Sequence, residues 1–230
     1  MAKDYKDNET EENPFSMSIG DLMSGLLFIF ILLLSATMLK VQQQSEYEAK
    51  ITQEYDKVKT QLYIDLQKEF KDSLKVWEAE IDSVHLSVRF QEPKTLFDVN
   101  EAKLQPKFKR ILEDFFPRYI NLLNQEQYRD NIEEIRIEGH TDSSGKYFHN
   151  MKLSQDRTRA VLEYCYSLLD KTSQDWVQSK ATANGLSYSH TILKSDGSGE
   201  EDSIRSRRVE FRIRTNAEEK LEQIAKKRNE

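Results

Sequence analysis

The sequence predicts an α+β fold class with three parts: a single N-terminal transmembrane helix, a long helical, coiled-coil-like linker, and a C-terminal domain built as a mixed α/β sandwich. Three observations support it. Residues 20–39 form the only membrane-length apolar run, residues 40–92 contain neither Pro nor Gly, and strand-like and helix-like patterns alternate from residue 84 onward. The expected segments are a tail at 1–15, the span at 16–40, the linker at 41–83, the domain at 84–215 and a charged terminal helix at 216–230.

Asp21 stands at the head of the apolar run, where a carboxylate costs roughly 2.5–3.5 kcal/mol on insertion scales. The run from Gly20 to Leu39 is long enough, at ~1.5 Å per residue, to cross a hydrocarbon core of ~30 Å. A cleaved signal peptide is the alternative. It would begin with basic residues, whereas the preceding residues are mostly acidic: Asp4, Asp7, Glu9, Glu11 and Glu12. An acidic residue inside a span is expected to carry or pair with a cation.

Composition narrows the function classes. The net charge of −6 and the pI of about 5.5 argue against nucleic acid as a direct partner. Cys165 is the only cysteine, so no disulfide can form within the chain, and a lone thiol in a helical pattern is most simply a small core residue. Lys3 and Lys6 before the span are balanced by Lys40 and Lys50 after it, so the positive-inside rule does not decide the orientation. The short N-terminal tail and the large C-terminal region favour an N-terminus in the cytoplasm and a C-terminal domain outside.

A helical stripe follows the span. Its apolar residues are three or four positions apart, at Ile51, Tyr55, Val58, Leu62, Leu66, Phe70, Leu74, Trp77, Ile81 and Val84. Charged residues and Gln fill the other faces, and such a narrow stripe is typical of a coiled coil. We therefore favour a parallel homodimer that continues up from the membrane. The alternative is that this helix lies on its own C-terminal domain.

The period of the apolar residues then changes to that of strands and shorter helices. Every second residue from Val84 to Phe90 is apolar, as in a strand with one buried face. An amphipathic helix follows from Leu104 and is expected to stop at Pro117. Further strands are expected around Ile135–Ile137 and Val209–Ile213.

Two helices and two loops are expected between those last strands. The loop 139–150 is rich in Gly, Ser, Asp and His, and Ser154 after it resembles an N-cap that opens a helix. A second helix around Trp176 is expected to end near Gly185. A Gly, Ser and acidic loop covers 195–206, and after the last strand Asn216 with Glu219 resembles a capping box.

The domain resembles the OmpA-like peptidoglycan-binding family in three blocks, in order. Phe97-Asp-Val-Asn-Glu-Ala-Lys-Leu104 resembles the opening segment of that family. Gly139-His-Thr-Asp-Ser-Ser-Gly145, followed by Asn150 and Arg157, resembles its central signature, and Arg207-Arg-Val-Glu-Phe211 its closing strand. Two positions depart from the pattern: His149 stands where a Tyr is common, and Ser206 where an Asn is common.

The resemblance implies a ligand, the diaminopimelate part of a peptidoglycan stem peptide. It implies that Asp142 meets the ammonium of the ligand and Arg157 its carboxylate. The chemistry agrees, because a zwitterionic amino-acid end needs an anion and a planar, bidentate cation close together. If Asp142 and Arg157 are considered without the rest of the motif, the alternative is an incidental ion pair on a surface loop. The other implied binding residues are Thr141, Asn150, Leu153 and Arg207.

The N-terminal segment resembles the B subunits of ion-driven stator motors, the MotB class, in the pattern Gly20-Asp21-Leu-Met-Ser24. The resemblance implies two B chains inside a ring of multi-pass A subunits, commonly five, and an aspartate that takes up and releases an ion, most simply a proton. Burial disfavours a charged carboxylate, so uptake of a proton fits Asp21. Ser24, one helical turn on, is a candidate partner, although a hydroxyl in a helix usually bonds its own backbone.

Within this class the chain is more similar to the B subunits of the Zorya antiphage defence complex than to flagellar ones. The span reads Asp-Leu-Met-Ser-Gly-Leu-Leu-Phe-Ile-Phe, and the tail before it lacks the strongly basic character expected of a flagellar B subunit. A flagellar stator subunit is the nearest alternative, and a passive wall tether is the alternative of another class. We expect no enzymatic activity, no cofactor and no metal site, because no histidine stands at metal-ligand spacing together with a carboxylate base. The expected location is the bacterial inner membrane, with the domain in the periplasm.

Overall fold

The computed structural model describes residues 14–91, 96–98 and 100–216. The chain divides into two compact units, Met1–Lys50 and Ile51–Glu230. The predicted N-terminal tail and the capping box of Asn216 with Glu219 fall almost wholly outside the described residues.

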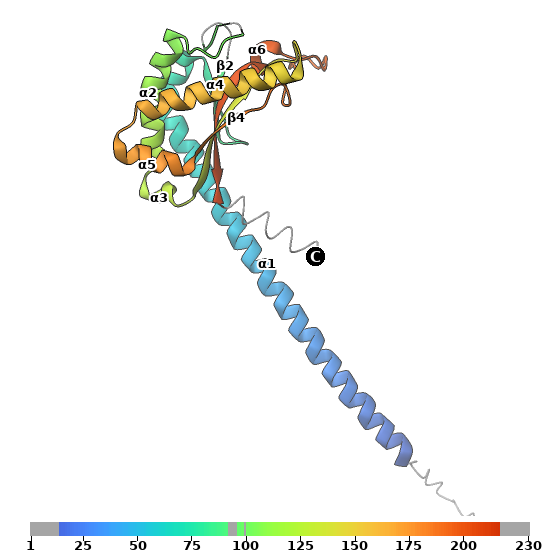
Figure 1. Ribbon diagram of the computed structural model, residues 1–230. Helices are drawn as coiled ribbons and strands as arrows, with labels where there is room; N and C mark the ends of the chain where they lie inside the picture. The colour runs from blue at the N-terminus through green and yellow to red at the C-terminus, as the bar shows by residue number, and fades with distance from the viewer. Residues whose placement is uncertain (1–13, 92–95, 99, 217–230) are drawn as a thin grey trace, which may run out of the picture. The chain divides into compact units, whose positions relative to one another are not determined.

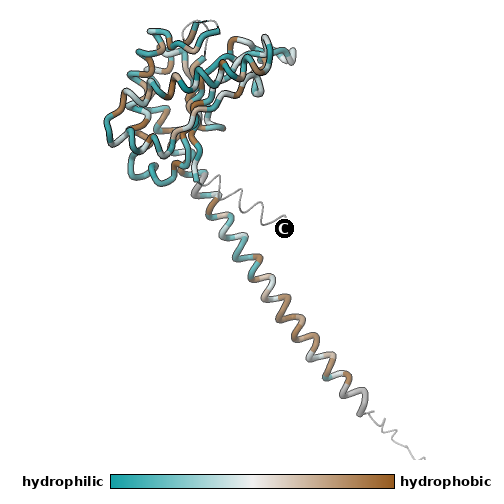
Figure 2. Tube along the Cα trace, viewed as in Figure 1, coloured by the Kyte–Doolittle hydropathy of each residue, from teal (hydrophilic) through white to brown (hydrophobic). Residues whose placement is uncertain are grey.

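The first unit contains the start of a long helix, α1 (Pro14–Trp77). Among the described residues it is the one helix long and apolar enough to cross a membrane. Its most apolar window has a mean hydropathy of 2.5, and none of that window is buried. Figure 2 shows this brown run along α1, with a more hydrophilic stretch after it. The expected long apolar helix is therefore confirmed.

A five-stranded sheet organises the second unit. The strands are ordered β1-β2-β5-β3-β4, and only β3 and β4 run parallel. Three helices lie on one side of the sheet (Figure 1): α2 (Pro106–Leu123), α4 (Tyr147–Ser167) and α5 (Lys171–Lys180). This is the predicted α/β sandwich. The remaining elements are β1 (Ala79–Asp82), β2 (Ser87–Gln91), α3 (Glu126–Arg129), β3 (Ile132–His140), β4 (Ala181–Gly185), α6 (Ser203–Ser206) and β5 (Arg208–Thr215).

Aromatic rings fill the centre of the core. Phe115 of α2 lies 5.0 Å, centroid to centroid, from Phe90 of β2 and 5.0 Å from Phe211 of β5. On its other side it lies 5.3 Å from Phe70 of α1. All four side chains are fully buried, and such aromatic pairs add roughly 0.5–1.5 kcal/mol each beyond the burial of their surface. Cys165 is also fully buried, as expected for a small core residue.

The apolar stripe of α1 packs onto its own domain from Leu62 onward. Leu62, Leu66 and Phe70 are fully buried, and Trp77 is 7% exposed. Our preference for a dimer seam along this part of the stripe is therefore wrong, and the alternative holds. The spacing of a stripe shows that an apolar surface covers it, but the surface can belong to the same chain or to another. The homodimer itself stays a prediction.

The boundary between linker and domain also differs from the expectation. The helix ends at Trp77, and the next residues form β1, a strand that we read as part of the helical stripe. The expected strand from Val84 begins only at Ser87, because the Asp82 carboxylate accepts the backbone N–H groups of Val84 and His85 at 2.8 and 2.9 Å. Such a side-chain bond closes a turn, so β1 and β2 form a hairpin.

Pro117 does not end α2, contrary to the expectation. A proline inside a helix costs about 3 kcal/mol. The turns after it bury four large apolar side chains, each stabilising by roughly 1.5–3 kcal/mol, so burial outweighs the cost. These side chains are Tyr119, Ile120, Leu122 and Leu123.

The segment Ala181–Gly185, expected to be helical, is the edge strand β4. At its end α4 crosses it closely: a Cβ at Gly185 would lie 2.3 Å from the backbone N of Gln155, so only glycine fits there. The close approach explains the glycine that ends the strand, and the parallel pairing with β3 places the strand at the edge of the sheet.

We predict that Leu66→Ala lowers the free energy of unfolding of the full chain by about 2–5 kcal/mol, because it leaves a cavity in the apolar core to which α1 contributes. The measurement is chemical unfolding followed by circular dichroism. Ile64→Ala, two residues away and 48% exposed, is the matched control and should change stability by no more than about 0.5 kcal/mol. Equal losses in the two variants would contradict the packing of α1 on its own domain.

Candidate functional site

The candidate site begins where β3 passes under α4. A Cβ at Gly139 would lie 2.7 Å from Cγ2 of Thr158 and 2.9 Å from the carbonyl O of Ser154. Only glycine permits this contact. The loop after β3 therefore starts from a point that is fixed against α4.

Ser154 does not cap α4, which begins at Tyr147. It lies inside the helix and is buried. Its hydroxyl donates to the Met151 carbonyl at 3.0 Å and accepts the Ser187 N–H at 3.1 Å. The N-cap prediction is wrong because this polar side chain serves a tertiary contact: it holds the turn after β4, where Ser187 also accepts the Thr141 N–H at 2.9 Å.

Side-chain hydrogen bonds close the loop between β3 and α4. Asp142 Oδ1 accepts the Ser144 N–H at 3.1 Å, and the Thr141 hydroxyl donates to the Asp142 carbonyl at 3.0 Å. The Asn150 amide donates to the Ser144 carbonyl at 2.8 Å and to the Asp142 carbonyl at 3.4 Å. Gly145 adopts a left-handed φ of 92°, which suits glycine. The predicted residues Thr141, Asp142 and Asn150 thus share one fixed loop.

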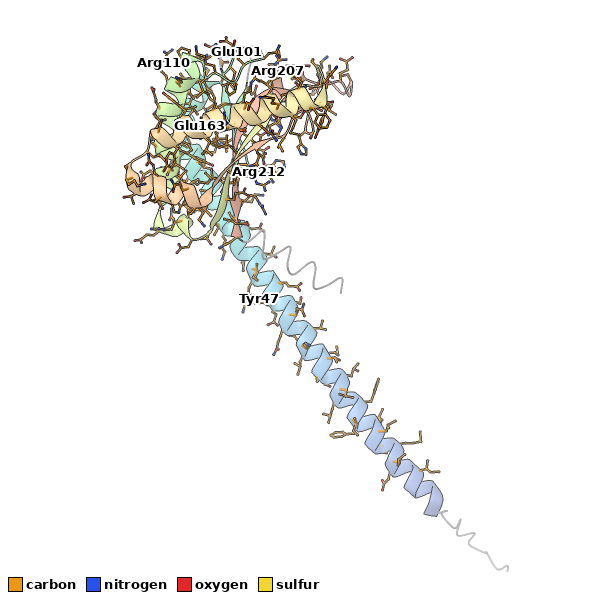
Figure 3. The ribbon with its side chains drawn as sticks, viewed as in Figure 1. Tyr47, Glu101, Arg110, Glu163, Arg207 and Arg212 are labelled. Atoms are coloured by element: carbon orange, nitrogen blue, oxygen red, sulfur yellow. The ribbon has the colours of Figure 1, made fainter. Side chains whose placement is uncertain are left out.

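Asp142 forms an ion pair with Arg207, another predicted residue. Arg207 Nη1 lies 2.5 Å from Asp142 Oδ2, and the two side chains are 31% and 13% exposed. Arg207 comes directly after α6 and before β5, so the third motif block meets the second one. Figure 3 shows Arg207 at the same end of the domain as Glu101.

Arg157, unlike Arg207, contacts the opening motif block, residues 97–104. It projects from α4 and is 7% exposed. Its Nε donates to the Glu101 carbonyl at 2.9 Å, its Nη2 donates to the Asp98 carbonyl at 3.1 Å, and its guanidinium lies 4.7 Å from the Phe97 ring centroid. These contacts fix the plane of the guanidinium. Leu153, one turn earlier on α4, is half-buried.

Glu201 is a further residue of the site, and the sequence patterns do not reveal it. Both of its carboxylate oxygens accept the Ser143 N–H, each at 3.2 Å, and the Ser143 hydroxyl also pairs with it. Glu201 therefore ties the loop 195–206 to the loop of Asp142. Its only signal in the sequence is an acidic residue shortly before the closing motif, which is too weak to identify a contact.

In the apolar part of α1, the Ser24 hydroxyl donates to the Gly20 carbonyl at 2.8 Å. This is the common outcome for a serine in a helix. Asp21 lies on the exposed surface of the same turn. The pairing of Ser24 with Asp21 stays a prediction.

Comparison with known proteins identifies both parts of the chain. The OmpA family matches residues 96–206. The Zorya protein ZorB of Escherichia coli strain Crooks is 44% identical over 223 residues, which cover 93% of this chain and 93% of that protein. This chain belongs to the ZorB family. The match confirms the resemblances to OmpA-like domains and to Zorya B subunits.

Two further proteins match at lower identity. A second ZorB, from Escherichia coli O139:H28, is 26% identical to this ZorB-family chain, over 90% of this chain and 82% of the other. Among solved structures, a MotB-like protein from Desulfovibrio vulgaris is 22% identical, covers 68% of this chain and 91% of its own, and has a TM-score of 0.47.

We predict that Asn150→Ala destabilises the domain by about 1–3 kcal/mol, because the carbonyls of Asp142 and Ser144 lose their donor in a partly buried place. Urea unfolding of the full chain in detergent measures the loss. Lys152→Ala on the same helix removes only an exposed ion pair with Asp156 and should cost at most about 1 kcal/mol. If both variants behave alike, Asn150 does not hold the loop.

Proposed function

We propose that this chain is the B subunit of an ion-driven membrane motor that is anchored to peptidoglycan and serves in Zorya antiphage defence. One observation carries the proposal: a single chain of the ZorB family joins an aspartate in a membrane-length apolar helix to an OmpA-family domain. A passive wall tether would need the OmpA-family domain, but it has no use for a carboxylate at Asp21.

The loop of Asp142 is the proposed wall-binding site. A diaminopimelate ammonium would replace Arg207 as the partner of the Asp142 carboxylate, which is a like-for-like exchange of one charge-assisted bond for another. The ligand carboxylate would meet Arg157, whose guanidinium plane is already fixed by two backbone carbonyls and the Phe97 ring. A fixed cation loses less side-chain entropy on binding, so a small zwitterion can be held.

Asp21 is the proposed ion carrier. In this role two B chains lie within a ring of A subunits, with the N-terminus in the cytoplasm and the domain in the periplasm. The Asp21 carboxylate alternates between a charged form and a protonated form, and each form favours a different packing of the surrounding helices. Anchorage of the B chains in the wall holds them still, so that the A ring turns against them.

We predict that Asp142→Asn weakens binding of the full chain to peptidoglycan roughly ten- to hundredfold, because a charge-assisted bond is worth about 1.5–3 kcal/mol. Co-sedimentation with purified sacculi measures this, with free diaminopimelate as competitor. Asp156→Asn, a carboxylate on the outside of α4 that pairs with Lys152, is the control and should bind as the unchanged chain does. Unaltered binding by a folded Asp142→Asn would reject the site.

We predict that Asp21→Asn abolishes protection against phage, while the level of the protein in the membrane and its co-purification with the A subunit stay unchanged. Asparagine has nearly the same shape but cannot exchange a proton at physiological pH. Plating efficiency of phage on cells with the complete defence system measures protection. Ser35→Ala, deeper in the same apolar helix, is the control and should protect fully. Full protection by Asp21→Asn would favour the passive tether.

A further inference from the structure

The side of the sheet away from the helices contains a polar cavity of about 300 Å³ that the proposed wall site does not use. Its floor consists of alternate residues of β3 and β5, while the residues between them face the apolar core. Arg212 of β5 lies on this side in Figure 3. Two turns supply the rim, with His85 between β1 and β2 and His190 after β4.

Two glutamates face each other across this floor. Glu138 of β3 and Glu210 of β5 are directly opposite in the antiparallel register, and they are 5% and 4% exposed. Like charges in this arrangement repel. The Glu210 carboxylate has partners: Arg89 Nε donates to Oε1 at 2.9 Å, and the Ser87 hydroxyl donates to Oε2 at 3.0 Å. Arg208 Nε pairs with Oε1 as well.

Glu138 has no comparable partner among the described residues. Its nearest cationic atoms are His140 Nε2 at 3.8 Å and Arg136 Nη1 at 3.9 Å, both too far for a hydrogen bond. His140 is 4% exposed, and neither of its ring nitrogens has a hydrogen-bond partner within the part of the chain that the structure describes. The buried imidazole of His140 thus lies beside the Glu138 carboxylate without a hydrogen bond to it, and a buried polar group without such a bond is costly.

The donor atoms of these groups suit a metal ion. A neutral imidazole offers one ring nitrogen with a lone pair, and a carboxylate offers two oxygens. Imidazole nitrogen and carboxylate oxygen are both common ligands of divalent metals.

We propose that Glu138, His140 and Glu210 bind one divalent transition-metal ion, zinc or manganese. One ligand atom from each residue lies within 4.8 Å of the other two, so small side-chain rotations bring all three to bonds of about 2.0–2.2 Å. Such an ion would screen the two glutamates from each other and satisfy His140 at once. One imidazole with two carboxylates is a donor set that zinc and manganese accept.

The surrounding side chains would shape this site. Arg89 and Arg208 both bond Oε1 of Glu210, which orients its Oε2 and resembles the outer-shell support common around metal ligands. The cavity is also lined by Arg136 and Arg212. The positive charges of these four arginines weaken the binding of a cation, so we expect a lower affinity than in a site without arginines. Because the ligands come from two neighbouring strands, the ion would cross-link β3 and β5 and raise the stability of the domain.

Titration calorimetry of the full chain in detergent, after treatment with a chelator, tests the site with ZnCl₂ or MnCl₂ alone. We expect one equivalent to bind per chain, and the thermal unfolding midpoint to rise with the metal concentration. Glu138→Gln and His140→Gln should each weaken binding by at least about tenfold, as the loss of metal-site residues does. Near-ultraviolet circular dichroism checks that both variants fold.

His85→Asn is the matched control. His85 is the other histidine paired with a carboxylate at this cavity, at 3.2 Å from Asp82, but its side chain is 50% exposed. This variant should bind the metal as the unchanged chain does. The proposal is overturned if the unchanged chain binds neither metal, a result that needs no variant to fold. It is also overturned if His85→Asn abolishes binding while His140→Gln retains it, since the ion would then lie at the rim.

Discussion

The packing of Phe115 against aromatic rings of three other elements is the interaction on which the domain depends. Phe70, Phe90 and Phe211 come from α1, β2 and β5, and all three contact it within 5.3 Å. Elements from opposite ends of the domain sequence therefore meet at one side chain. This contact positions β5 in the middle of the sheet, next to β3. The start of β5 carries the arginine that pairs with Asp142, and the end of β3 leads into the loop of Asp142 itself.

The two sides of the sheet have different tasks as a result. The side under the helices is closed by apolar side chains and by glycine contacts that leave no space, such as that of Gly139 with α4. The other side carries charged side chains in rows across the strands, where Arg89 alone pairs with Glu80, Asp82 and Glu210. The candidate wall site lies at one end of the sheet, where loops after β3 and before β5 meet. The apolar side under the helices makes the domain rigid, whereas the charged side and the loops carry its polar and charged groups.

Much of this arrangement could be predicted from the sequence, because it depends on local patterns. Alternation identified β2 and β5, the motif blocks identified Thr141, Asp142 and Asn150 as one loop, and a long apolar run identified the first part of α1. The rest depends on contacts between distant residues. The strand β4 could not be predicted from propensity, because its residues Ala-Thr-Ala-Asn-Gly include few strong strand formers and its pairing with β3 is a contact between distant residues. The same holds for Glu201 and for the facing pair of Glu138 and Glu210, which only the register of the strands brings together.

The burial of Leu62, Leu66, Phe70 and Trp77 has a practical consequence for work with a soluble fragment. A shortened protein that starts at residue 84, where the pattern suggests a domain boundary, would remove one wall of the apolar core and the first strand of the sheet. Its new surface would expose Phe90 and Phe115, and large apolar patches of this kind promote aggregation. A fragment that starts at Ile51, the beginning of the second compact unit, keeps that wall in place. The last part of α1 thus belongs to the core of the domain.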